Sequence, residues 1–158
     1  MVGSASVVEK GSVAPDFTLD SDDGGPVTLS DLRGQRVVLY FYPKDDTPGC
    51  TVQACDFRDA MPRFEGIGAV VLGVSADDVA SHRAFREKFD LSFPLLADVG
   101  GAVSERYGVW GRRIVRGKPL RGIERSTFLV DEEGVVQEVW RGVNPRGHME
   151  MLAEILGA

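Results

Sequence analysis

The sequence is poor in the residues that build disulfide scaffolds and metal clusters. Its 158 residues include two cysteines, Cys50 and Cys55, and two histidines, neither of which is close to the cysteines in the chain. Two cysteines without a neighbouring histidine make a poor set of zinc ligands, so we expect no metal site. With no export signal visible, the pair suits reversible redox chemistry better than a structural disulfide.

The sequence also lacks long apolar runs and an excess of positive charge. No run approaches the roughly 20 apolar residues of a membrane-spanning helix, so we expect no membrane partner. Residues 1–5 lack the basic segment and apolar core of a signal peptide, which favours a cytoplasmic protein. The net charge of −6 argues against nucleic acid as a partner. We interpret the basic stretch 112–121 as a solvated loop or hairpin, with docking of an acidic protein as the alternative.

The composition is that of an ordinary globular protein, with 43% hydrophobic and 27% charged residues. A chain of this length can bury one sizeable core. Because it contains no repeat, low-complexity tract or linker, we predict a single domain over residues 1–158, with residues 1–10 loosely ordered.

Apolar periodicity predicts strands and helices in alternation. The strand–helix–strand order over residues 36–75 indicates a parallel, right-handed crossover. Residues 93–98 are expected at the sheet edge, and the last helix is expected to place Met149, Leu152, Ile155 and Leu156 on one face. The elements predict an α/β fold with a central mixed sheet and helices on both faces. Strands are predicted over residues 14–20, 27–29, 36–42, 68–75, 93–98, 126–130 and 135–140, and helical segments over 30–34, 50–64, 77–89, 102–107 and 145–156.

The stretch 42–55 joins a buried strand to a helix and holds both cysteines. Pro48 and Gly49 change the chain direction, so Cys50 is expected in the first helical turn, close after Thr47. The free amides and the positive dipole end of that turn stabilise a thiolate and can hold an anion in front of it. A buried structural cysteine is the alternative, but the Thr-Pro-Gly run and the strand-to-helix position favour a reactive one.

The spacing of Cys55 suggests two states of this helix. Residues five apart on a helix have Cα atoms roughly 8–9 Å apart, beyond the limit of about 7 Å for a disulfide. A folded helix would therefore carry a free thiol at Cys50. Pairing of the two cysteines would require the first helical turns to unwind.

Several motifs resemble the peroxiredoxins of the bacterioferritin-comigratory, or Q, type, and the resemblance spans nearly the whole chain. The pattern Pro43-x-x-x-Thr47-x-x-Cys50 is specific to peroxiredoxins, and a second cysteine five residues on is typical of this type. The resemblance implies a thioredoxin-like fold. The other matching segments are residues 13–19, 41–44, 107–111 and 122–129.

The resemblance also implies a thiol peroxidase that reduces hydrogen peroxide and organic hydroperoxides without a cofactor. It implies that Cys50 attacks the O–O bond and becomes a sulfenic acid, and that Cys55 resolves this acid into an intramolecular disulfide. Thioredoxin or another dithiol would then reduce the disulfide, and a monomer would suffice.

Further residues match the family's active site. They are Pro43, Thr47 and Arg125, with Thr47, Gly49, Gln53 and Arg125 as expected substrate contacts. Two positions depart from the family pattern. Gln53 stands where many relatives have Glu, and Asp46 stands where many have Asn.

The remaining polar residues are given structural interpretations. His82 and His148 are read as surface or structural residues, and Asp45 and Asp46 as a solvated turn. Two other functions stay open at this point. A thiol-disulfide oxidoreductase is disfavoured because Cys-x-x-Cys is absent. A redox-sensing or chaperone-like binding module would use the same disulfide without turning over peroxide.

Overall fold

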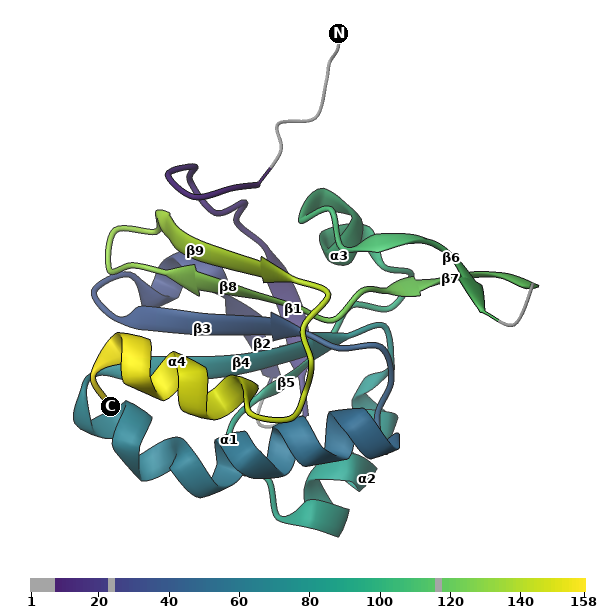
Figure 1. Ribbon diagram of the computed structural model, residues 1–158, viewed down its shortest axis with the longest axis horizontal. Helices are drawn as coiled ribbons and strands as arrows, with labels where there is room; N and C mark the ends of the chain where they lie inside the picture. Colours follow the sequence, from purple (N-terminus) through teal and green to yellow (C-terminus); the bar gives the residue numbers. More distant parts are fainter. Residues whose placement is uncertain (1–7, 23–24, 116–117) are drawn as a thin grey trace, which may run out of the picture.

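A seven-stranded mixed sheet forms the centre of the protein (Figure 1). The structure is a computed structural model that describes residues 8–22, 25–115 and 118–158. The central strands β3, β4 and β5 are parallel, whereas β1, β2, β8 and β9 run antiparallel to their neighbours. In spatial order the strands are β2 (Gly25–Thr28), β1 (Thr18–Ser21), β5 (Leu95–Ala97), β4 (Ala69–Ser75), β3 (Arg36–Phe41), β8 (Ser126–Val130) and β9 (Val136–Arg141).

Helices cover both faces of this sheet, as the sequence predicts. One face packs against α1 (Pro48–Gly66), α2 (Val79–Phe89) and α4 (His148–Leu156), and Figure 1 shows α1 and α4 side by side below the sheet. The other face packs against η1 (Leu29–Leu32) and α3 (Ala102–Arg106). Among the described residues, no helix combines the length and the apolar character needed to cross a membrane.

The predicted basic loop or hairpin at 112–121 is a hairpin of two strands. It consists of β6 (Trp110–Val115) and β7 (Lys118–Ile123), which form a separate two-stranded sheet. Figure 1 shows it projecting beyond the end of the central sheet. Residues 116–117 lie outside the described residues.

Strand β3 is buried on both faces, which confirms the reading of its uncharged sequence. Val38 and Tyr40 point into the core under α1 and α4, while Leu39 and Phe41 belong to the core on the other face. None of these side chains is more than 1% exposed. A strand fixed on both sides gives the following loop a rigid starting point.

The structure corrects the predicted place of residues 93–98. They were expected at the sheet edge, but β5 lies inside the sheet between β4 and β1. Leu95 and Leu96 are completely buried, one on each face. The partner on the outer side is β1, which pairs Asp20 with Ala97 from a distant part of the chain.

Two element boundaries and the orientation of one side chain also differ from the prediction. The first strand begins at Thr18 rather than at residue 14, since Pro15 has no amide proton to give to a ladder. Helix α4 begins at His148, after Gly147 in a left-handed conformation. Ile155 is 52% exposed and is not on the buried face of α4. The i, i+3, i+4, i+7 set that faces the core is Met149, Leu152, Ala153 and Leu156.

The buried hydroxyl of Tyr40 leads to a stability prediction. Tyr40 Oη has no hydrogen-bond partner among the described residues, and it lies over Gly73, where an added Cβ would approach it to 3.0 Å. Tyr40→Phe should raise the free energy of unfolding, measured in urea, by about 1–3 kcal/mol, because it removes a buried polar atom that has no hydrogen-bond partner.

Tyr107→Phe is the matched control for this prediction. The Tyr107 ring is equally buried, but its hydroxyl donates a hydrogen bond to the Pro15 carbonyl at 2.6 Å. This variant should lose roughly 1 kcal/mol. Equal losses in the two variants would contradict the assignment of Tyr40 Oη as unpaired.

Candidate active site

The start of α1 lies at the end of the sheet where β3 finishes. Tyr42 extends the buried strand, and its amide bonds to the Val74 carbonyl at 3.0 Å. Thr47 is the N-cap residue and Pro48 the first helical residue, so α1 begins two residues earlier than predicted. Cys50 lies in the first turn, as the sequence predicts.

Arg125 reaches Cys50 because of the direction of β8. This strand is antiparallel to β3 and pairs Ser126 with Phe41, so the beginning of β8 lies beside the end of β3. Arg125 Nη2 lies 3.2 Å from Cys50 Sγ, across 75 residues of sequence. The sulfur-bearing residue is 1% exposed. The guanidinium is permanently charged, so it places a fixed positive charge beside the sulfur.

Gln53 holds the guanidinium in place one turn further along α1. Its Oε1 accepts a hydrogen bond from Arg125 Nη1 at 2.6 Å, and the residue is completely buried. The neutral amide therefore orients Arg125 although it carries no charge. Its Nε2 has no hydrogen-bond partner among the described residues.

Gly49 lets the guanidinium lie close to the helix backbone. A Cβ at this position would be 3.1 Å from Arg125 Nη2 and 3.2 Å from Cγ of Pro145, in the loop before α4. Any side chain at residue 49 would therefore press on the arginine or on this loop. The absence of one keeps the amides of the first turn next to Arg125.

The other predicted site residues lie around this group. Thr47 Oγ1 donates to the Lys44 carbonyl at 2.8 Å, which leaves its lone pairs available as acceptors. Pro43 is exposed at the start of the loop. Cys55 is half-buried further along the unbroken helix, and both thiols are free. Cys50, Gln53 and Arg125 are thus in direct contact, whereas Cys55 lies on the same helix without a bond to Cys50.

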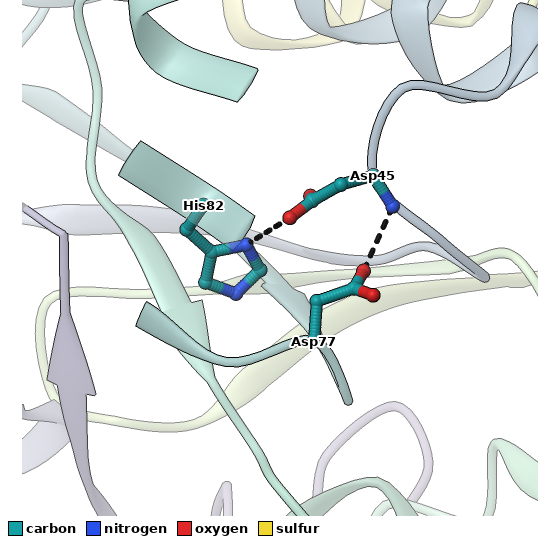
Figure 2. A group of neighbouring side chains, drawn as sticks. All are labelled: Asp45, Asp77 and His82. Carbon is teal, nitrogen blue, oxygen red and sulfur yellow. Dashed lines mark hydrogen bonds and ion pairs between the residues drawn. The ribbon is translucent and has the colours of Figure 1, made fainter. Parts of the chain in front are cut away.

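Asp45 is buried, which corrects its reading as part of a solvated turn. It is 7% exposed, and its carboxylate accepts hydrogen bonds from Tyr42 Oη at 2.6 Å and Ser81 Oγ at 2.8 Å. Figure 2 shows it facing His82, whose Nδ1 lies 2.7 Å from Asp45 Oδ2. Asp46 is exposed, as expected, and pairs with Lys88.

His82 is a buried structural residue rather than a surface one. Its Nε2 bonds to the Leu96 carbonyl at 2.8 Å, so both ring nitrogens face acceptors. Burial lowers the pKa of His82, but the hydrogen bond and negative charge of Asp45 outweigh it and raise the pKa above its ordinary value. Sequence reasoning missed this pair because its members lie 37 residues apart. The available signal was an aspartate soon after an uncharged strand.

Asp45, Asp77 and His82 are the described residues with the best arrangement for a metal ion. Their nearest ligand atoms lie within 4.8 Å of one another. However, Asp77 Oδ2 already accepts bonds from the Asp45 amide and Ser75 Oγ, and the other two residues bond to each other. Protein donors thus occupy the atoms that a metal would use.

His148, the first residue of α4, is also buried. Its Nε2 lies 2.8 Å from Thr127 Oγ1, and its ring packs edge-on against Trp140. Burial, assisted by the positive charge of Arg125, lowers the pKa of His148 to about 4. The imidazole is therefore neutral near pH 7.

The two histidines should give stability opposite dependences on pH. The unfolded state binds a proton at His148 below about pH 6.5 while the folded state does not until about pH 4. Wild-type stability should thus fall as the pH drops through this window, and His148→Gln should flatten the fall by on the order of 1 kcal/mol per pH unit.

His82→Gln is the control, because the contribution of His82 to the free energy of unfolding should depend on pH in the opposite direction. Because the folded pKa of His82 is raised, its contribution is complete below about pH 6.5 and is lost as the pH rises through the folded value. This variant should therefore lose most stability in acid and least in alkali. Urea denaturation across the pH range would test both, and curves parallel to wild type would contradict them.

Comparison with known proteins gives one family for the chain. Residues 10–139 match the AhpC/TSA family. The chain is 50% identical over 150 residues to a putative peroxiredoxin Bcp of Coxiella burnetii, a match that covers 95% of this chain and 97% of the relative. It is 48% identical over 142 residues to peroxiredoxin Bcp of Bacillus subtilis, with 90% of each chain covered.

Solved structures lead to the same group. Peroxiredoxin Q of Xanthomonas campestris superposes with a TM-score of 0.87 at 40% identity, over 98% of both chains. PrxQ of Xylella fastidiosa superposes with a TM-score of 0.90 at 36% identity, over 96% of this chain and 97% of that one.

Proposed function

The chain belongs to the AhpC/TSA family, as a peroxiredoxin of the Bcp/PrxQ group, and it has the thioredoxin-type fold of that group. From this family membership we propose how its own residues reduce a peroxide. As a thiol peroxidase it takes a peroxide as substrate and a thiol as reductant. The observation that carries the proposal is the contact between Arg125 and the buried sulfur of Cys50 in the first turn of α1.

In the proposed first step, the Cys50 thiolate attacks the nearer oxygen of a hydroperoxide. An S–O bond forms, the O–O bond breaks, and the products are a sulfenic acid and an alcohol, or water when the substrate is hydrogen peroxide. The departing oxygen leaves with the electron pair, needs a positive charge beside it, and takes a proton from solvent to become the alcohol or water. Arg125 supplies that charge, and the amides of Gly49 and Cys50 are fixed donors at the same point.

Thr47 and Pro43 are proposed to shape the place where the peroxide lies. The Thr47 hydroxyl gives its proton to the Lys44 carbonyl, so it can accept a hydrogen bond from the peroxide O–H. This orients the substrate with its O–O axis toward the sulfur. Pro43 begins the loop that carries Thr47, and we assign it a shaping role rather than a reactive one.

In the proposed second step, the Cys55 thiol attacks the sulfenic sulfur of Cys50. A disulfide forms and water leaves, which removes Cys50 from the path to irreversible oxidation. Both residues lie on α1 with Cα atoms roughly 8–9 Å apart by helix geometry, so the first turns must unwind for the sulfurs to meet. An external dithiol, such as thioredoxin, would then reduce the disulfide.

The scope of the activity is proposed from the same site. Among the described residues, the charged group that contacts Cys50 is Arg125, which already bonds to Gln53, so we propose uncharged substrates: hydrogen peroxide and organic hydroperoxides. One relative, the bacterioferritin comigratory protein of Xanthomonas campestris, has alkyl peroxide reduction activity. Because both cysteines lie on one helix, we also propose that residues 1–158 act as one domain in a monomer.

Single cysteine variants test the two roles. Cys50→Ser should abolish consumption of peroxide. Cys55→Ser should still consume one equivalent of peroxide in a first burst. It should then stop even in the presence of a dithiol reductant. Mass spectrometry after one equivalent should find the Cys50–Cys55 disulfide in wild type and a sulfenic acid in Cys55→Ser. Equal loss of the burst in both variants would contradict the assignment.

Hydrogen exchange on the two redox forms tests the unwinding. In the oxidised protein, amides over residues 50–55 should lose protection because the helical bonds of the first turns are broken. Amides of β3 and β4 serve as the internal control and should keep theirs. Unchanged protection over residues 50–55 in a sample that carries the disulfide would refute the unwinding.

A further inference from the structure

A buried polar network holds the loop that precedes α1, on the side away from Arg125. At its centre is the Asp45 carboxylate, which accepts bonds from Tyr42 Oη, Ser81 Oγ and His82 Nδ1. These three donors come from the end of β3 and from α2. The side chain of Asp45 thus connects the loop to two elements that belong to the rigid core.

The backbone of Asp45 is held as well. Its amide donates to Asp77 Oδ2 at 2.8 Å, and the same oxygen accepts a bond from Ser75 Oγ at 2.7 Å, at the end of β4. The next residue, Asp46, has a φ of 57°, a left-handed conformation that a free loop would seldom keep. Thr47 follows directly as the N-cap of α1.

The charges of Asp45 and His82 match each other. His82 is completely buried, and its Nε2 must donate to the Leu96 carbonyl, which has no proton to give. Nδ1 faces a carboxylate that already receives two hydroxyl protons. A proton shared between His82 and Asp45 satisfies both groups, whereas loss of either partner would leave the other buried without compensation.

This arrangement bears on the unwinding of α1. If the first turns of α1 unwind, the loop that precedes them will also move unless its own contacts hold it in place. Asp45 lies two residues before Thr47 and five before Cys50, and it is fixed through both its side chain and its amide. It is therefore a suitable boundary between the part that moves and the part that does not.

We propose that the Asp45–His82 pair is a positioning device for the peroxidatic loop, which favours the folded, peroxide-reactive form of α1 over the unwound, disulfide-forming one. The inference rests on the proposed function of Cys50 and Cys55. Neither residue of the pair touches the sulfur, so both act through the placement of Thr47 and the first turn. The pair therefore sets the equilibrium between the folded and the unwound form of the first turns of α1.

The test measures the two chemical steps separately in His82→Gln. In a Cys55→Ser background, rapid mixing with peroxide should show sulfenic acid formation slowed by about 10- to 100-fold, since the site is less often correctly formed. With Cys55 present, conversion of sulfenic acid to disulfide should be faster than in wild type, because the unwound form is more often populated. The opposite movement of the two rates distinguishes positioning from a general loss of structure.

Asp22→Asn is the matched control. The Asp22 side chain is as buried as that of His82 and pairs with Arg86 on the same helix α2, but this pair holds Leu91, Phe93 and Leu95 rather than the loop. This variant should lower the melting temperature while leaving the ratio of the two rates at the wild-type value. If Asp22→Asn and His82→Gln change the ratio alike, the proposal is wrong.

Two further measurements keep the test decisive. If His82→Gln does not fold, Ser81→Ala removes one donor to Asp45 and should shift the ratio in the same direction by a smaller factor; an unchanged ratio overturns the proposal. EDTA should alter neither rate in wild type. If EDTA lowers either rate and added Zn²⁺ restores it, these residues form a metal site and the proposed ion pair is wrong. If Cys50→Ser still consumes peroxide, the proposed function itself fails, an outcome independent of His82.

Discussion

The chemistry proposed for this protein depends on one contact, the 3.2 Å approach of the Arg125 guanidinium to the sulfur of Cys50. A thiolate withdrawn from water costs free energy unless a charge and hydrogen bonds replace the lost solvent. Arg125 provides the charge, and the first turn of α1 provides amides and a positive dipole end. Gln53 fixes the guanidinium, and Gly49 leaves room for it beside the helix. Gln53 and Gly49 thus both support this contact.

The sheet explains why these groups meet. The parallel strands β3 and β4 end at the same edge, so the residues that follow them, Asp45 and Asp77, lie close together there. Strand β8 runs the opposite way, so the residue before it, Arg125, arrives at this edge too. One parallel and one antiparallel pairing of β3 therefore bring the acidic network to one side of Cys50 and the cation to the other.

The same helix start has to satisfy two opposing demands. In the mechanism we propose, peroxide reduction needs the first turn intact, because its amides and Thr47 define the place of the substrate. Disulfide formation needs that turn open, because an unbroken helix keeps Cys50 and Cys55 too far apart. A fold that serves both needs a firm boundary on the sheet side and a helix end that can melt, and we propose the buried Asp45 as that boundary.

The sequence by itself determined the order of the elements, the buried nature of β3 and the position of Cys50 at a helix start. These features depend on neighbours in the chain: an uncharged apolar run, then Pro48 and Gly49, then helix-forming residues. The resemblance to peroxiredoxins added Arg125, which local reasoning would have left on the surface.

Only the tertiary structure decided which distant residues meet. It placed β5 inside the sheet, brought Arg125 to Cys50 across 75 residues, and buried Asp45 against His82. It also turned Ile155 outward, since Met149, Leu152, Ala153 and Leu156 already fill the face of α4 that meets the core. The physical reason is common to all of these. Strand pairing and burial are set by contacts between segments far apart in the chain, and local periodicity carries no information about them.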